Sequence, residues 1–410
     1  MPISLTDANT LLAAAESASS GVASLSREAA CELLRADDDA LPALLSAAQA
    51  ARAKFKPPII TYSRKVFLPL TNLCRDYCGY CVFRRDPAQP GAHTMTPDEV
   101  MEVVHAGERM GCTEALFSLG DKPELLFPEI RETLHQLGYK STLHYLEAMC
   151  EKVLRESSLL PHPNPGLMSA EWLERMSRVA PSMGLMLETT STRLLAKSAA
   201  HDNAPDKEPA KRMRVIEDAG RQQIPFTTGI LIGIGEMLEE RVDTLIAIRD
   251  MHARYGHIQE VIVQNFRAKA GTPMAHWPEP DRADMLRTLA VARLLMPKMN
   301  IQAPPNLSDP HYADLLDGGI NDWGGVSPLT PDFINPEKPW PHLEELQRRT
   351  EAKGFELRQR LPVYPEFVRM TASTHSAAFA QPSEVQRDLL AQRLGGAADL
   401  EGYAQEKRAA

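Results

Sequence analysis

The feature that most restricts the fold is an alternation of short apolar or β-branched runs with longer helical patterns, between about residues 60 and 330. This rhythm is typical of repeated βα units on a parallel sheet. Eight strands are predicted, at residues 66–70, 114–119, 159–162, 183–188, 226–232, 260–264, 301–304 and 321–325. Eight such units match the roughly 250 residues of a closed (β/α)8 barrel. A doubly wound open sheet is the alternative, because periodicity alone does not distinguish the two.

Three segments are expected along the chain. Residues 1–55 are predicted to form an Ala-rich helical extension, residues 56–345 the barrel, and residues 346–410 a C-terminal helical appendage. A proline-rich stretch at residues 328–341 predicts an excursion with polyproline II or turn character. The expected fold class is therefore α/β, a (β/α)8 TIM-type barrel with N-terminal and C-terminal helical extensions.

The composition and net charge of the chain restrict the kinds of molecule that it is expected to bind. Of the 410 residues 43% are hydrophobic, enough for a large core, and the net charge is −9 without the basic, aromatic surface that nucleic acid needs. The most apolar run, residues 226–238, is short and broken by glycines, and the first residues lack a Lys/Arg-rich start. Six cysteines are too few for a disulfide framework and indicate a reducing compartment. We expect a cytoplasmic protein that acts on a small molecule, without nucleic acid or membrane partners.

Three cysteines, Cys74, Cys78 and Cys81, have C-x3-C-x2-C spacing in the string TNLCRDYCGYC, directly after the first predicted strand. Thiolates on one loop at a barrel rim can converge on one metal centre. Three thiolates satisfy three irons of a 4Fe–4S cube and leave the fourth iron open, whereas an electron-transfer cluster normally takes four. An open iron can chelate the amino and carboxylate groups of S-adenosylmethionine. Cleavage of the carbon–sulfur bond then gives a 5′-deoxyadenosyl radical that abstracts hydrogen from a substrate.

A structural zinc site is the alternative interpretation of this triplet. Zinc needs a fourth Cys or His ligand, and the next histidine, His93, lies beyond a proline-containing loop without a second ligand pair. Cys31, Cys112 and Cys150 are each isolated in a helical pattern, where the expected role is that of a small buried apolar side chain. A zinc or electron-transfer protein without catalytic activity is therefore the alternative from a different function class.

With Tyr80 just before the third cysteine, the motif resembles the cluster motif of the radical S-adenosylmethionine enzymes. This resemblance implies a 4Fe–4S cluster and S-adenosylmethionine as cofactors, together with an external one-electron donor. It also implies that Gly120 and Asp121, after the second predicted strand, hold the methionine ammonium group. An ordinary turn is the other interpretation of this Gly-Asp pair.

Further contacts to S-adenosylmethionine are expected after the fourth and fifth predicted strands. The side chains of Glu188 and Ser191 are expected to bind the ribose hydroxyls; otherwise Glu188 belongs to a buried ion pair, because a carboxylate after an apolar strand needs a partner. One of two arginines is expected to neutralise the methionine carboxylate, and two glycines to let the backbone approach the adenine. These residues are Arg212, Arg214, Gly233 and Gly235.

Longer strings carry a narrower resemblance. Over about residues 59–345 the chain resembles the 7,8-didemethyl-8-hydroxy-5-deazariboflavin synthases, and specifically their cyclising radical subunit or domain. The strings that carry this resemblance are ITYSRKVFLPLTNLCRDYCGYC, ALFSLGDKPE, LLPHPNPGLMS, APSMGLMLETTS, IPFTTGILIGIGE, HIQEVIVQNFRAK and DWGGVSPLTPDFINPEKPWP. The first 55 residues or so and the C-terminal tail carry little of it.

The resemblance implies a carbon–nitrogen lyase that closes the ring of a deazaflavin. The substrate would be 5-amino-5-(4-hydroxybenzyl)-6-(D-ribitylimino)-5,6-dihydrouracil, and ammonia would leave as 7,8-didemethyl-8-hydroxy-5-deazariboflavin forms. S-adenosylmethionine would be consumed to methionine and 5′-deoxyadenosine. Only one C-x3-C-x2-C occurs in the 410 residues, so the radical enzyme that couples tyrosine to the uracil is expected on a separate chain.

A planar, polyhydroxylated substrate calls for amide and hydroxyl groups and flat walls. Tyr62 and Arg64 precede the first predicted strand, and further substrate contacts are expected at Gln264, Asn265, Asn306, Asp322 and Trp323. Loop capping and core packing explain each of these residues equally well when taken singly. Tyr62, His162 and Asp322 are candidates for proton transfer, and none of the three is assigned.

Two other radical enzymes remain as alternatives within the same chemistry. The chain could be the tyrosine-coupling partner itself, or a different barrel enzyme of the biotin-synthase type. Both alternatives keep the cluster at the three cysteines and change only the substrate.

Overall fold

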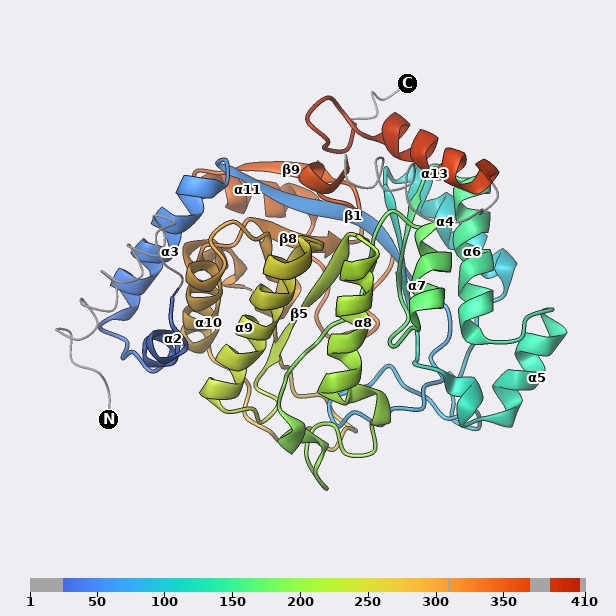
Figure 1. Ribbon diagram of the computed structural model, residues 1–410, viewed down its shortest axis with the longest axis horizontal. Helices are drawn as coiled ribbons and strands as arrows, with labels where there is room; N and C mark the ends of the chain where they lie inside the picture. Colours follow the sequence, from blue (N-terminus) through green and yellow to red (C-terminus); the bar gives the residue numbers. More distant parts are fainter. Residues whose placement is uncertain (1–24, 309, 369–383, 406–410) are drawn as a thin grey trace.

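The computed structural model describes residues 25–308, 310–368 and 384–405, and its centre is a barrel of eight parallel strands (Figure 1). The strands follow the order β3-β2-β1-β8-β7-β6-β5-β4, so the first strand lies between the second and the last. A sheet with this order must curl almost into a closed ring, and it stays open between β3 and β4. The predicted (β/α)8 barrel is therefore confirmed, and the doubly wound open sheet is excluded.

Each of the eight barrel strands lies at a predicted position, although most of the strands differ in length from the prediction. Their bounds are β1 Ile59–Pro69, β2 Glu114–Ser118, β3 Leu160–Asn164, β4 Met183–Gly184, β5 Phe226–Ile232, β6 Ile258–Asn265, β7 Ile301–Gln302 and β8 Asp322–Val326. The fifth strand has the predicted bounds. The fourth is much shorter than predicted, because the chain leaves the ladder after Gly184 and returns only in an isolated bridge between Glu188 and Ile230.

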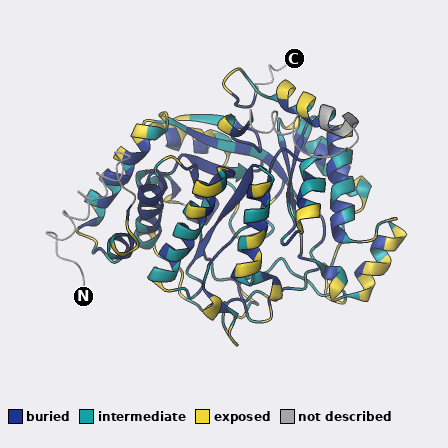
Figure 2. Ribbon diagram, in the orientation of Figure 1, coloured by how far each residue is buried: buried dark blue, intermediate teal, exposed yellow. Residues whose placement is uncertain are grey.

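Helices surround the barrel, and their outer faces are exposed while the strands are buried (Figure 2). The α4 helix shows how the sequence starts one: Pro97 is in its first turn, and Thr96 and Glu99 form a reciprocal capping box. The helices are α2 Arg27–Leu34, α3 Leu41–Phe55, α4 Pro97–Arg109, α5 Pro128–Gln136, α6 Thr142–Glu156, α7 Ala170–Ser177, α8 Pro209–Arg221, α9 Leu238–Tyr255, α10 Arg282–Leu295, α11 Leu343–Ala352 and α13 Glu384–Ala397.

The N-terminal helices are joined to the barrel by a buried arginine. Arg52 of α3 donates hydrogen bonds to the carbonyls of Ile320 (3.1 Å), Pro57 (2.9 Å) and Ile59 (3.0 Å), which flank β8 and β1. The α3 helix also packs along α10 (Figure 1). The described part of the predicted extension therefore shares one hydrophobic core with the barrel.

A ninth strand, β9 (Glu356–Arg360), closes the N-terminal end of the barrel. It pairs in parallel with the first half of β1, whereas β2 pairs with the second half. The next residues cross beneath the barrel, where the carbonyl of Pro362 accepts hydrogen bonds from Ser182 Oγ (2.7 Å) and Gln259 Nε2 (3.1 Å). The sequence analysis predicted only helix in this region, because Glu-Leu-Arg-Gln-Arg contains no apolar run that would indicate a strand.

Parts of both predicted extensions, residues 1–24, 369–383 and 406–410, lie outside the described residues. Within the described ranges, none of the helices combines the length and the apolar character that a transmembrane helix needs.

Candidate active site

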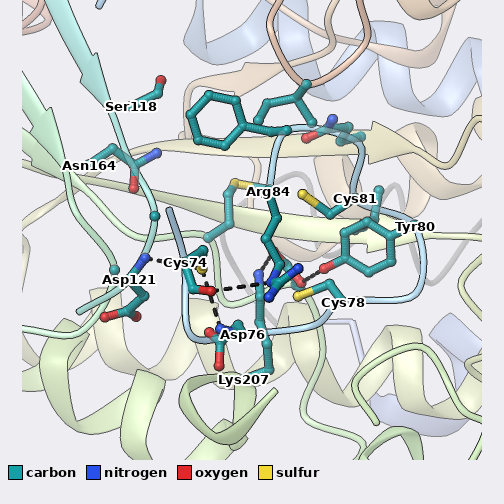
Figure 3. Close-up of a pocket in the computed structure, with 18 of the residues that line it drawn as sticks. Cys74, Asp76, Cys78, Tyr80, Cys81, Arg84, Ser118, Asp121, Asn164 and Lys207 are labelled. Atoms are coloured by element: carbon teal, nitrogen blue, oxygen red, sulfur yellow. Dashed lines mark hydrogen bonds and ion pairs between the residues drawn. The ribbon is translucent and has the colours of Figure 1, made fainter. Parts of the chain in front are cut away.

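The three cysteines of the triplet line one pocket of about 270 Å³ at the carboxyl ends of the barrel strands. Cys74, Cys78 and Cys81 lie on the loop that follows β1, and their side chains are partly buried (Figure 3). We call this cavity the outer pocket. Gly120 lies close against the cysteine loop, because a Cβ atom at this position would come within 1.9 Å of the Leu73 carbonyl oxygen. The predicted Gly-rich turn therefore lets the end of β2 approach the cysteine loop.

Two of the three thiols lie in surroundings that disfavour the free thiolate. Cys74 Sγ accepts backbone N–H groups from Asp76 (3.4 Å) and Asp121 (3.2 Å). Burial raises the pKa of Cys74 to about 12 and raises the pKa of Cys78 well above its usual value. These thiols therefore stay protonated at neutral pH unless a metal replaces the proton.

The three sulfur atoms are not gathered as tightly as the ligand atoms of a single zinc ion. A zinc ion holds its ligand atoms within about 2.3 Å of itself, which brings all of them close together. The three cysteines do not form such a close group; in the described part of the chain, the carboxylates of Asp76, Asp121 and Asp206 do, within 4.8 Å of one another. That acidic group is neutralised by neighbouring cations, since Arg75 and Lys122 both form ion pairs with Asp206.

Glu188 is the centre of a buried network at the side of the outer pocket. Its carboxylate accepts hydrogen bonds from the hydroxyl of Tyr80, from Nε2 of His201 and from the ammonium of Lys207 (Figure 3 shows Tyr80 and Lys207). Burial acts to raise the pKa of Glu188, but Lys207 and the hydrogen bond from His201 hold it well below its usual value. Glu188 also has a φ of +65°, an unusual backbone conformation for a non-glycine residue.

Glu188 therefore belongs to a buried ion pair and also lines the pocket, and its contact with the ribose hydroxyls stays a prediction. Lys207 and His201 were missed by the sequence analysis. Neither lies in a recognisable motif, and only the fold brings them to Glu188.

Asp121 lines the outer pocket with its carboxylate held in place. One oxygen accepts the backbone N–H of Leu167 (3.1 Å), and the other forms an ion pair with Lys122 (3.0 Å). Burial raises the pKa of Asp121 to about 6 despite the opposing charge of Lys122. A positively charged ligand group in the pocket would favour the ionised form of this carboxylate.

The other predicted S-adenosylmethionine contacts are placed differently. Arg212 lines the pocket, but its guanidinium donates to the carbonyls of Met186 and Asp206 and so positions the chain. Arg214 has an 82% exposed side chain and faces solvent. The hydroxyl of Ser191 donates to Glu240 (2.6 Å), outside the pocket lining.

Gly233 and Gly235 have positive φ angles of +88° and +98° and also lie outside the pocket lining. Cβ atoms there would come within 2.3 Å of Pro280 and 2.8 Å of Trp277 respectively. These glycines therefore permit close packing of the loop after β6, and the neighbouring Leu231 and Phe266 line the pocket instead.

A second cavity, of about 190 Å³, lies inside the barrel and is lined by several residues of the outer pocket as well. We call it the inner chamber, and we call the shared residues the waist. The waist consists of Ser118, Asn164, Leu185, Met186, Gln264, Ile334 and Asn335. Figure 3 shows Ser118 and Asn164 on the side of the outer pocket away from Tyr80. The two cavities therefore adjoin at the waist.

The proline-rich excursion, residues 328–341, lies along this cavity and is called the strap. Asp332 holds it in shape by accepting hydrogen bonds from the amides of Asn306 and Asn335 (both 3.0 Å). Trp340 lines the inner chamber and stacks on Phe67, with the ring centroids 5.2 Å apart and the planes 8° apart. The strap thus gives the chamber a flat aromatic wall.

The structure brings some predicted substrate residues to the cavities. Gln264 and Asn265 line the outer pocket, and His162 lines the inner chamber. Asn306 lies outside both linings, where its amide also donates to the carbonyl of Lys338 (3.0 Å) in the strap.

Three other predictions need correction. Trp323 is buried in the core and donates to Thr350 Oγ1 (3.0 Å) on the helical side of β8. Asp322 faces the barrel interior but lies below the chamber, bound to Arg360 (2.6 Å). Tyr62 is on the outer face of β1, because side chains alternate along a strand and Thr61 and its alternate neighbours face inward. Position near a strand end did not reveal which face each side chain would take.

Several known proteins are similar to this chain. The family model of the radical SAM superfamily matches residues 68–248. The 7,8-didemethyl-8-hydroxy-5-deazariboflavin synthase of Methanopyrus kandleri is 51% identical over 311 residues, which are 76% of this chain and 93% of that protein. The FO synthase of Mycobacterium tuberculosis is 53% identical over 338 residues, 79% of this chain but only 40% of that protein. This chain therefore spans less than half of the longer FO synthase.

The FeFe-hydrogenase maturase HydG from Carboxydothermus hydrogenoformans superposes with a TM-score of 0.69 at 18% identity, over 95% of this chain and 90% of that chain. At this identity the likeness concerns the fold alone. Membership of the superfamily implies a 4Fe–4S cluster and S-adenosylmethionine. The site geometry and the extended match to a synthase lead to one conclusion: the chain is a radical SAM enzyme of the 7,8-didemethyl-8-hydroxy-5-deazariboflavin synthase family.

Proposed function

We propose that this enzyme closes the deazaflavin ring. Its substrate is 5-amino-5-(4-hydroxybenzyl)-6-(D-ribitylimino)-5,6-dihydrouracil, and its products are 7,8-didemethyl-8-hydroxy-5-deazariboflavin and ammonia. The observation that carries the proposal is that a pocket lined by three cysteines adjoins a second chamber inside the barrel, with seven lining residues in common. A cofactor at the cysteines and a small molecule in the chamber would meet at the waist.

The outer pocket offers a donor set that fits the implied cofactors. Cys74, Cys78 and Cys81 would hold the cluster, with S-adenosylmethionine bound beside it in the same pocket. The Asp121 carboxylate lines the same pocket and is available to the methionine ammonium. When bound, the two cofactors supply the one-electron chemistry that removes a hydrogen atom from the substrate.

The protein itself contributes positioning and exclusion of water. The network around Glu188 fixes Tyr80 beside the cysteine loop. The strap covers the inner chamber, and its Trp340–Phe67 stack offers a flat surface to an aromatic ring. Keeping water away from a reactive radical prevents side reactions.

Reconstitution tests this proposal directly. Anaerobic protein is supplied with iron, sulfide, dithionite, S-adenosylmethionine and the tyrosine–uracil adduct, and the product is identified by mass and fluorescence. We expect a fluorescent 8-hydroxydeazaflavin together with methionine and 5′-deoxyadenosine. A protein with an intact cluster that forms no deazaflavin would contradict the proposed reaction.

The tyrosine-coupling reaction belongs, in this proposal, to a second radical centre outside these 410 residues, because they contain a single cysteine triplet. Supplying tyrosine and 5-amino-6-ribitylaminouracil without a second enzyme should leave both unchanged. Consumption of tyrosine would favour the coupling reaction instead. Metal analysis checks the remaining alternative, since zinc without sulfide would exclude radical chemistry.

A further inference from the structure

The inner chamber has a polar floor that the proposed cofactor chemistry does not use. We define the floor by the residues that line the chamber but not the outer pocket and that carry polar side chains deep in the barrel. These residues are Lys65, Glu114, His162, Thr227, Glu260, Gln302 and Arg360. Glu114 precedes the waist residue Ser118 by four positions on β2, which corresponds to a distance of about 13 Å along the strand. The floor is therefore well separated from the cysteines.

Charged groups on the floor already have partners. Lys65 Nζ lies 2.7 Å from Glu114, and Arg360 bridges Glu260 (2.9 Å) and Asp322 (2.6 Å). These side chains are nearly inaccessible to solvent. Because each charge is compensated, the floor does not call for a charged ligand.

His162 has one nitrogen that lacks a partner and opens into the chamber. The hydroxyl of Ser182 donates its single hydrogen to the carbonyl of Pro362 (2.7 Å), so it must accept from Nδ1 of His162 (2.8 Å). The proton therefore sits on Nδ1, and Nε2 carries a lone pair. Within the described residues Nε2 has no hydrogen-bond partner, and it is not sealed away from the cavity.

The imidazole stays neutral in this position. Burial lowers the pKa of His162 to about 4, with Lys65 and Arg360 acting in the same direction and Glu114 opposing them. At neutral pH Nε2 is thus an acceptor and not a donor.

Three amide side chains around the chamber are also without partners in the part of the chain that the structure describes. Gln302 belongs to the floor, and Asn164 and Gln264 belong to the waist. Each amide offers two donor hydrogens and one acceptor oxygen. A ligand that pairs with amides and a lone-pair nitrogen must both donate and accept, which is the chemistry of a hydroxyl group.

We propose that the floor of the inner chamber binds the ribityl chain of the substrate, with His162 Nε2 accepting a hydrogen bond from one of its hydroxyl groups. This inference rests on the proposed function. The reacting rings must lie at the waist, nearest to the cysteines, so the polyhydroxylated chain extends to the opposite end. The aromatic wall of Trp340 and Phe67 suits the rings, and the unpaired polar atoms of His162 and Gln302 on the floor suit the chain.

Two variants of His162 separate a binding role from a structural one. His162→Gln can place an acceptor oxygen near the position of Nε2, whereas His162→Asn can keep the contact with Ser182 but does not reach the chamber. His135→Asn, on the exposed side of α5, is the matched control. Each reconstituted protein is assayed with the full adduct and with an analogue that carries N-methyl in place of the ribityl group. Binding of both compounds is also measured without reductant, so that no turnover occurs.

We expect His162→Asn to raise the KM and Kd for the full adduct about 3- to 10-fold, the effect of one lost hydrogen bond, with kcat changed less than about 2-fold. His162→Gln should recover most of this loss, and His135→Asn should match the wild type. The wild type should bind the N-methyl analogue more weakly than it binds the full adduct. His162→Asn should bind the analogue at least as tightly as the wild type does.

Two results would overturn the inference while leaving the proposed function intact. One is a wild-type enzyme that binds the N-methyl analogue as tightly as the full adduct, a measurement that needs no variant to fold. The other is His162→Asn weakening both compounds equally, as a structural defect would. A wild type that converts no full adduct contradicts the proposed function, and the inference falls with it.

Discussion

The outer pocket and the floor of the inner chamber differ in how they are built. The outer pocket consists of loops, three cysteine side chains and Glu188, whose backbone has a positive φ. The floor of the inner chamber consists of strand residues whose charges are already paired, as in Lys65–Glu114 and Arg360–Asp322. The charges of the floor are balanced without a ligand, whereas the outer pocket acquires its chemistry only when the cofactors bind. Changes at the outer end should therefore abolish activity, and changes at the inner end should first reduce stability.

The largest expected effect is at the cysteines. Cys74→Ala, Cys78→Ala and Cys81→Ala should each abolish cleavage of S-adenosylmethionine, because two thiolates cannot hold the cube. Cleavage is followed by chromatography of 5′-deoxyadenosine, and cluster content by iron and sulfide analysis. Cys31→Ala, which changes a cysteine buried in α2, is the control and should keep full activity. Loss of the cluster in Cys31→Ala would show that the three-ligand assignment is wrong.

At the inner end, Arg360→Met should lower the free energy of unfolding by about 3–5 kcal/mol, because it leaves two buried carboxylates without their partner. Arg348→Met, which removes an exposed partner of Glu345, should lower the free energy of unfolding far less, because solvent screens an exposed ion pair. Urea denaturation of the cluster-free protein measures both. Equal losses in the two variants would contradict the distinction between a paired floor and an ordinary surface.

The pH dependence of the free energy of unfolding gives a second test of the paired charges on the floor, through Glu114. Burial alone would raise its pKa, but Lys65 and the other nearby cations lower it from 4.5 to about 2. Below pH 4.5 the unfolded chain binds a proton here that the folded protein does not, so stability falls as the pH drops toward 2. A shift of this size corresponds to about 3 kcal/mol. Urea titrations at pH 5 and pH 3 give the free energy of unfolding of the wild type and of Glu114→Gln. The difference between the two proteins should be smaller at pH 3 than at pH 5. An unchanged difference would show that Glu114 does not have a lowered pKa in the folded protein.

The smallest effect is expected at Arg214, which belongs to neither end of the cavity. Its side chain is 82% exposed and forms a loose pair with Asp218 (3.8 Å). Arg214→Ala should leave S-adenosylmethionine cleavage unchanged and alter stability by less than about 0.5 kcal/mol. A large loss of cleavage would restore Arg214 as a cofactor contact and would contradict the solvent-facing position.

Patterns that are local in the sequence predicted local structure well. The β5 strand is a continuous apolar and β-branched run, and its bounds were predicted correctly because a strand buried on both faces leaves such a run. The cysteine triplet was equally visible, since its spacing lies within a single loop. The alternation of side chains was harder to apply at strand ends, so Trp323 and Asp322 were grouped together although they face opposite sides of β8.

Contacts between residues that are far apart in the chain were not predicted. Lys207 and His201 reach Glu188 only through a turn between strands. Arg360 lies in a charged string without strand character, and its role depends on carboxylates 38 and 100 residues away. A single sequence carries no signal for these contacts, because each is made by the packing of elements that are individually unremarkable.

The position of β9 also sets the order in which the protein can be completed. Its partner β1 begins at Ile59, whereas β9 begins at Glu356, so the two cannot pair until most of the chain has left the ribosome. Until then Glu260 and Asp322 have no guanidinium to compensate them, and the lower mouth of the barrel is open to water. Pairings between such distant segments form late, because the intervening loop must first be closed. A segment that is synthesised late in the chain therefore closes the N-terminal end of the barrel.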